Sequence, residues 1–140
     1  MRIKKFESFE TYYNYLKVGF MYKHYTTPVC YIGRNTTEKY QTTCLLFQKD
    51  GSMDFIEWVD WLNSEDELPP LDKKKMITLK EYIIDKQIVG KTLKVFEQYR
   101  KKNYKPNSIE IIEEMYEKLI NDKDIMMAKD IEENIIKYNL

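Results

Sequence analysis

The sequence predicts an α+β fold that is mainly α-helical, in which a small antiparallel β-hairpin near the amino end precedes a helical carboxyl-terminal half ending in an αα-hairpin. Two observations predict this class. The segments 28–33 and 41–47 are β-branched and aromatic and flank a polar stretch, which is typical of paired strands. Beyond residue 78 the apolar residues recur at helical spacing to the end of the chain.

The amino-terminal part, expected to span 1–70, begins with a helix and the hairpin. Ser8 is placed to cap that helix, whose apolar face carries Phe9, Tyr12, Tyr13, Leu16 and Phe20. The hairpin is centred near Thr37, a register in which Cys30 faces Cys44.

An acidic helix, expected from about Met53 to Ser64 after a turn at 50–52, supplies the first candidate binding surface. Helical projection places Trp61 among the acids of this helix and Trp58 at the margin of its apolar face. A large aromatic side chain on a polar face is typical of an interface anchor. We therefore expect a protein partner with a basic groove, or a nucleoprotein, to be bound by Trp61, Asp54, Glu57 and Trp58.

The prolines and acids of 64–72 mark the boundary to a helical part, 71–140, although one compact domain is an alternative. Thr78 to about Lys102 is one long helix or two helices joined near Gln87–Gly90. Ser108 caps the next helix, and a turn at Asn121–Asp124 precedes the last one. The inward residues are expected to be Ile109, Ile112, Tyr116 and Leu119 in one and Ile125, Ala128, Ile131 and Ile135 in the other.

The segment 78–102 resembles a helix-turn-helix, with a turn at Gln87–Gly90 between a supporting and a recognition helix. Its apolar positions are occupied by Tyr82, Ile88, Leu93 and Phe96, but Ile83, Lys86 and Gln87 depart from the usual pattern. One side of the second helix carries donors that could meet phosphates or base edges, namely Lys91, Lys94, Gln98 and Lys101. The resemblance implies a regulator that binds duplex DNA.

Few residues offer reactive chemistry. His24 is the single histidine, and no nearby Asp or nucleophile suggests a triad. Cys30 and Cys44 have no metal-ligand spacing and are expected to be buried thiols. Val89-Gly90-Lys91-Thr92 lacks the earlier glycine of a phosphate-binding loop. We expect no catalytic residues, no metal and no cofactor.

Charge comes in four blocks: +5 over 1–49, −8 over 50–72, +8 over 73–105 and −5 over 106–140. Such blocks indicate docking on a partner, or a homo-oligomer through complementary charge. One alanine against twenty lysines is typical of an AT-rich genome, and no apolar run would span a membrane. We expect a small cytoplasmic accessory or inhibitory protein of a phage or mobile element, with a DNA-binding regulator as the alternative and an enzyme third.

Overall fold

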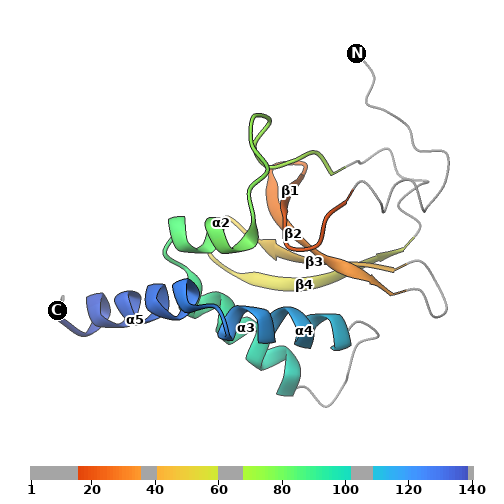
Figure 1. Cartoon of the computed structure of the whole chain (residues 1–140). Helices are drawn as coiled ribbons and strands as arrows, with labels where there is room; N and C mark the ends of the chain where they lie inside the picture. The colour runs from red at the N-terminus through yellow and green to blue at the C-terminus, as the bar shows by residue number, and fades with distance from the viewer. Residues whose placement is uncertain (1–15, 36–40, 60–67, 102–108, 139–140) are drawn as a thin grey trace. The chain divides into compact units, whose positions relative to one another are not determined.

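The computed structural model describes residues 16–35, 41–59, 68–101 and 109–138 (Figure 1). They form a four-stranded antiparallel sheet followed by four helices, which confirms the α+β, mainly helical fold class. The chain divides into two compact units, Met1–Ile77 and Thr78–Leu140, called here the sheet unit and the helical unit.

The sheet is a meander of β1 (Met21–His24), β2 (Thr27–Asn35), β3 (Gln41–Phe47) and β4 (Met53–Val59) in that order. The predicted hairpin is the pair β2–β3, but its register differs from the prediction. Tyr31 pairs with Cys44 and Cys30 pairs with Leu45. A bulge between Tyr31 and Gly33 adds a residue to β2. Because side chains alternate along a strand, the two cysteines lie on opposite faces of the sheet and do not face each other.

The acidic helix predicted from Met53 is wrong where the structure describes it, because Met53–Val59 is the strand β4 and pairs with β3 throughout. The predicted turn does exist, with Gly51 at φ 89° and the carboxylate of Asp50 accepting a hydrogen bond from the N–H of Ser52 (2.9 Å). It closes a β-hairpin. Phe55 and Ile56 are residue types that favour strands, and here they pair with Leu45 and Cys44 of β3.

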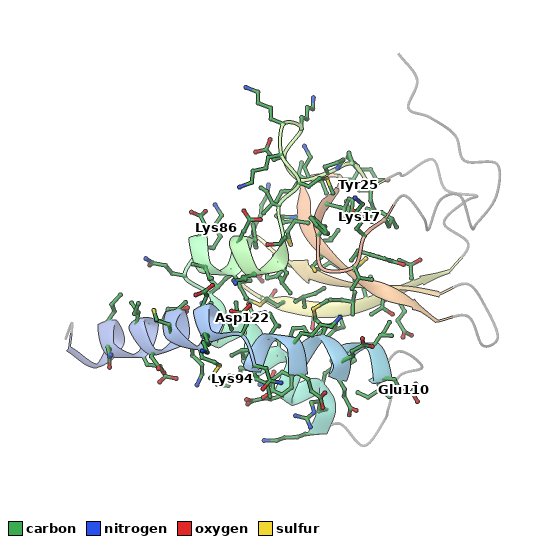
Figure 2. All side chains as sticks on the ribbon, viewed as in Figure 1. Lys17, Tyr25, Lys86, Lys94, Glu110 and Asp122 are labelled. Atoms are coloured by element: carbon green, nitrogen blue, oxygen red, sulfur yellow. The ribbon has the colours of Figure 1, made fainter. Side chains whose placement is uncertain are left out.

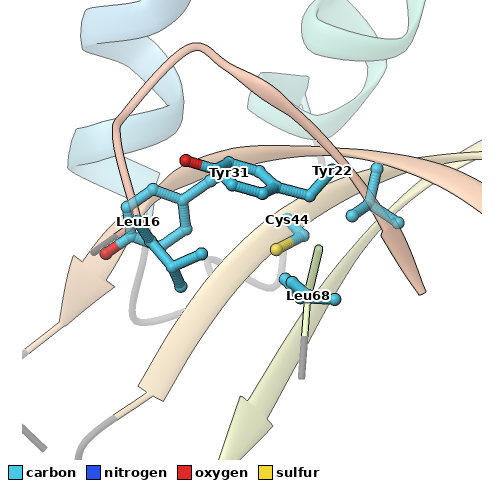
Figure 3. Packing of buried hydrophobic residues seen from close by; sticks show 6 residues of the cluster. Leu16, Tyr22, Tyr31, Cys44 and Leu68 are labelled. Atoms are coloured by element: carbon cyan, nitrogen blue, oxygen red, sulfur yellow. The ribbon is translucent and has the colours of Figure 1, made fainter. Parts of the chain in front are cut away.

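The first predicted helix falls mostly outside the described residues, which exclude Ser8, Phe9, Tyr12 and Tyr13. Leu16 and Phe20 are described: Leu16 lies in a bend, and Phe20 follows the turn at 18–19 and accepts a hydrogen bond from the N–H of Tyr31 (3.1 Å). Leu16 is nevertheless buried. It packs in a cluster on one face of the sheet together with Tyr22, Val29, Tyr31, Cys44 and Leu68 (Figure 3).

The segment 68–77 runs along the outer edge of β1. Met21 donates its N–H to the carbonyl of Ile77 (2.7 Å) and accepts from the N–H of Leu71 (3.1 Å). Lys23 donates to the carbonyl of Pro69 (2.8 Å). These bonds attach the segment to the sheet unit and satisfy the edge of its first strand.

The helical unit contains α2 (Leu79–Asp85), α3 (Val89–Lys101), α4 (Ile109–Ile120) and α5 (Lys123–Tyr138). Thr78 and Glu81 form a capping box at the start of α2. After α2 the N–H groups of Gln87 and Ile88 donate back to the carbonyls of Ile84 (3.1 Å) and Ile83 (3.0 Å), and Gln87 has φ 57°. This is a Schellman motif, so 78–101 forms two helices rather than one.

The α4–α5 junction is a two-residue turn at Asn121–Asp122. The carboxylate of Asp122 accepts from the N–H groups of Asp124 (2.9 Å) and Ile125 (3.2 Å), which caps α5 (Figure 2). Lys80 on α2 contacts the same carboxylate at 3.1 Å. Burial alone would raise the pKa of Asp122, but these hydrogen bonds outweigh it and hold the pKa below its usual value.

Candidate functional site

The acidic residues predicted to bind a partner do not form one surface. Asp54 and Glu57 are three positions apart on β4, so their side chains leave opposite faces of the sheet. Asp54 pairs with Leu46, whereas Glu57 pairs with Thr43. Trp58 belongs to β4, where the structure describes its backbone, and Trp61 lies outside the described residues. The helical face that would have joined these four residues is therefore absent over 53–59.

The four residues of the DNA hypothesis do lie on α3. Lys91, Lys94, Gln98 and Lys101 are all exposed, and Figure 2 labels Lys94 on the helical unit. The opposite side of α3 is buried, as predicted, through Val89, Leu93 and Phe96. The helix therefore presents a polar side outward and an apolar side inward.

A groove of about 630 Å³ lies between α3 and α5, and we call it the α3–α5 groove. Gly90, Ile135 and the almost fully buried Leu93 form its apolar lining. Its remaining lining is polar and carries three cations and three carboxylates: Gln87, Lys91, Lys94 and Glu97 from the first side, and Lys129, Glu132 and Glu133 from α5. Lys91 and Lys94 thus belong both to the exposed side of α3 and to this groove.

Glu132 binds the start of α3. Its carboxylate accepts hydrogen bonds from the N–H of Val89 (3.0 Å) and from the N–H of Gly90 (3.4 Å). The first amides of a helix have no acceptor within the helix and carry partial positive charge, so a carboxylate there is stabilised.

The other two carboxylates of the groove also have partners. Glu133 lies 3.1 Å from the ammonium of Lys129, which raises the pKa of Lys129. Glu97 accepts a hydrogen bond from the hydroxyl of Tyr116 (3.0 Å). Burial and this bond raise the pKa of Tyr116, and the guanidinium of Arg100 lies 4.9 Å from the centre of its ring.

Lys91 and Lys94 differ from the carboxylates around them. Within the ranges that the structure describes, neither ammonium makes a hydrogen bond or an ion pair. The α3–α5 groove therefore combines apolar surface with two cations that have no partner among the described residues, while all three of its carboxylates already have one. This arrangement suits a ligand that carries both carboxylates and apolar groups.

A second feature, missed by the sequence analysis, is an exposed row of apolar side chains on α5. Met127, Ile131 and Ile135 are 61%, 53% and 47% exposed and stand four residues apart. We call them the α5 apolar stripe. Ile131 and Ile135 were predicted to face inward, and that prediction is wrong. The second half of α5 has α3 on one side, across the groove, and in Figure 1 it extends past the end of α4.

Cys30, Cys44 and His24 carry side chains that could supply a nucleophile or a general base. Cys30 and Cys44 are fully buried, and burial raises the pKa of both thiols far above the usual range. His24 ends β1, where its ring meets that of Tyr25 edge-on at 4.8 Å. Among the described residues, no three His, Cys, Asp or Glu side chains are arranged to hold a metal ion.

Comparison with known proteins found no match to a protein family, to a curated protein or to a solved structure. None of the helices described is long and apolar enough to cross a membrane.

Proposed function

We propose that this protein acts by stoichiometric binding to a protein or nucleoprotein partner, as a small non-catalytic accessory or inhibitory protein, and that the helical unit supplies the binding surface. The α5 apolar stripe carries this proposal. Large apolar side chains that are about half exposed and spaced four apart form a continuous row along a helix, and such rows are typical of helix-mediated recognition.

The composition supports the biological setting of the proposal. One alanine against twenty lysines fits an AT-rich genome such as that of a phage or mobile element, and a cytoplasmic site of action belongs to the same proposal. Trp61 stays a prediction as an additional anchor, because it lies outside the described residues.

Affinity purification from cells of the source organism tests the function, with Ile131→Asp as the disruptive variant. Val18→Asp is the matched control, because Val18 is 49% exposed but belongs to the sheet unit. We expect a protein that is retained in constant molar ratio by wild type and by the control and is lost with Ile131→Asp. Hydrogen exchange of the reconstituted complex should then show protection of α5. Equal retention by all three forms would refute the role of the helical unit.

Duplex DNA binding is the second candidate, because α2 and α3 are joined by a tight Schellman turn and expose Lys91, Lys94, Gln98 and Lys101. Glu132 already occupies the first amides of α3, where a DNA phosphate is often bound. A gel shift at low salt decides between duplex DNA and a protein partner. Binding that weakens steeply with salt and is abolished by changing the three lysines to Glu would favour DNA, and a wild-type protein that shifts no duplex would end this candidate.

A further inference from the structure

We propose that the α3–α5 groove, together with the α5 apolar stripe, binds an acidic amphipathic helix of the partner protein. The inference rests on the proposed function and names the chemistry of the segment that would be bound. It follows from Lys91 and Lys94 standing beside Leu93 and Ile135 in one groove.

The lining carries three Lys and three Glu, so its formal charge is zero, and the preference for an acidic ligand follows from which of these groups already have partners. Glu97, Glu132 and Glu133 each have a partner in this chain, whereas Lys91 and Lys94 have none among the described residues. A ligand carboxylate would meet two ammonium groups that no described carboxylate pairs with. A basic ligand would bring more positive charge next to Lys91 and Lys94 and would supply neither of them with a counter-charge.

The apolar surface selects a helix over a small anion. Ile135 belongs both to the groove and to the stripe, so the apolar surface continues from the groove to Ile131 and Met127. Two turns of α5 separate Met127 from Ile135, a length of about 12 Å. A helix laid alongside α5 can cover this length with residues at i, i+4 and i+7 and place its flanking carboxylates over α3.

The same groove disfavours a nucleic acid. A phosphate backbone presents closely spaced charges that cannot avoid the three carboxylates in the lining. An acidic helix carries separate carboxylates that can stand over Lys91 and Lys94 and leave Glu132 and Glu133 opposite polar or apolar positions. A protein segment is therefore the occupant to test first.

The test uses a fluorescein-labelled synthetic peptide of about 16 residues, with Leu along one helical face and Glu along its borders. A second peptide replaces every Glu by Gln. Binding to the full chain is measured by fluorescence anisotropy. We expect the Glu peptide to bind at least about tenfold more tightly than the Gln peptide, and Lys91→Glu with Lys94→Glu to weaken it at least about tenfold.

Lys101→Glu is the matched control for charge, because Lys101 is also exposed on α3 but does not line the groove. It should change peptide affinity by less than about twofold. Ile131→Ser should weaken both peptides alike, since it removes apolar contact only. Thermal unfolding of each variant establishes that it is folded.

Several results would overturn the proposal. The Glu peptide could fail to bind or bind no better than the Gln peptide, or Lys101→Glu could weaken it as much as the paired change. A wild-type dimer that Lys91→Glu with Lys94→Glu converts to monomer in sedimentation would identify a second copy as the occupant. Displacement of the peptide by duplex DNA, lost with the same two lysines, would identify a nucleic acid.

The two proposals fail in different ways. If Ile131→Asp abolishes capture of the natural partner while the paired lysine change has no effect, protein binding stands and the acidic-helix assignment falls. If neither change affects the natural partner, the helical unit is not the binding surface and both proposals fall.

Discussion

Removing the carboxylate of Glu132 should destabilise the helical unit, because this side chain holds the start of α3. The N–H groups of Val89 and Gly90 both donate to it, at 3.0 and 3.4 Å. Ile88, the residue immediately before α3, has no side-chain acceptor that could replace it. Glu132 on α5 thus acts as a cap supplied from a distant part of the chain.

The size of the effect follows from capping and helix-dipole energies. Loss of an N-cap costs about 0.5–2 kcal/mol, and a favourable charge at a helix start contributes about 0.3–1 kcal/mol. The second hydrogen bond is long, so we expect Glu132→Ala to lower the free energy of unfolding by about 1–2 kcal/mol. Glu132→Gln should cost roughly half as much, because its amide oxygen still accepts but carries no charge.

Urea unfolding followed by circular dichroism at pH 7 measures these differences. The control is Glu133→Ala, whose half-exposed ion pair with Lys129 is worth about 0.3–0.5 kcal/mol. The reasoning is refuted if Glu132→Ala costs no more than this control. The same change should strengthen binding of the acidic peptide, because it removes a negative charge from the α3–α5 groove. Stability and affinity would then move in opposite directions.

Three further predictions concern turns, caps and thiols. Gln87→Gly should stabilise the protein by up to about 1 kcal/mol in thermal unfolding, because Gln87 has φ 57°, whereas Gln98→Gly in the exposed middle of α3 should destabilise it by about 1 kcal/mol. Asp122→Ala should cost about 1 kcal/mol at pH 7 in urea unfolding, and Asp122→Asn less, because asparagine also caps. The folded pKa of Asp122 is lowered, so its contribution is present above the unfolded pKa of about 3.9 and is lost as pH falls through the folded value. Cys30 and Cys44 should react with a thiol reagent only after unfolding, because both are buried.

Each of these has an outcome that contradicts it. A destabilised Gln87→Gly would show that the side chain of Gln87 contributes more than its backbone strain costs. If Asp122→Ala lowers the free energy of unfolding by as much at pH 3 as at pH 7, the ionised carboxylate does not supply the stabilisation. Fast labelling of either cysteine in the native protein would show that the sheet opens far below the unfolding midpoint.

The helical half was predictable because its signals are local. The capping box at Thr78 involves residues three positions apart, and the apolar residues of α3 and α4 repeat every three or four positions. The break between α2 and α3 was left open, since Gln87 is not the glycine usual at a left-handed position. The structure decided it through two hydrogen bonds back into α2.

The sheet was less predictable because pairing joins distant residues. Phe55 and Val59 are four apart, which fits a helix, whereas the β-branched and aromatic content of MDFIEWV fits a strand. Only the partner strand β3 distinguishes the two. The register of Cys30 depended on the pairing nearer the hairpin turn, where Gly33 faces Thr43 rather than Gln41, and on one added residue at the bulge, and composition signals neither.

Of the α3–α5 groove, only the residues contributed by α3 could be predicted from the sequence. Lys91 and Lys94 were identified from the helical projection of a single segment, and the structure shows them exposed. Glu132 and Ile135 join them through tertiary packing of α5, which helical periodicity cannot reveal. The exposed Ile131 was missed for the same reason, since an apolar period says which face is apolar but not whether anything covers it.

The hydrogen bonds between β1 and the segment 68–77 set the order in which the sheet can be completed during synthesis. β1 is the first of the four strands to leave the ribosome, yet its outer edge gains partners only once Pro69, Leu71 and Ile77 have followed. Until then the nascent sheet carries an open edge, onto which another nascent chain could pair. Ile77, the last of these partners along the chain, directly precedes Thr78, the cap of α2, so the edge of β1 gains its last partner at the boundary between the two units.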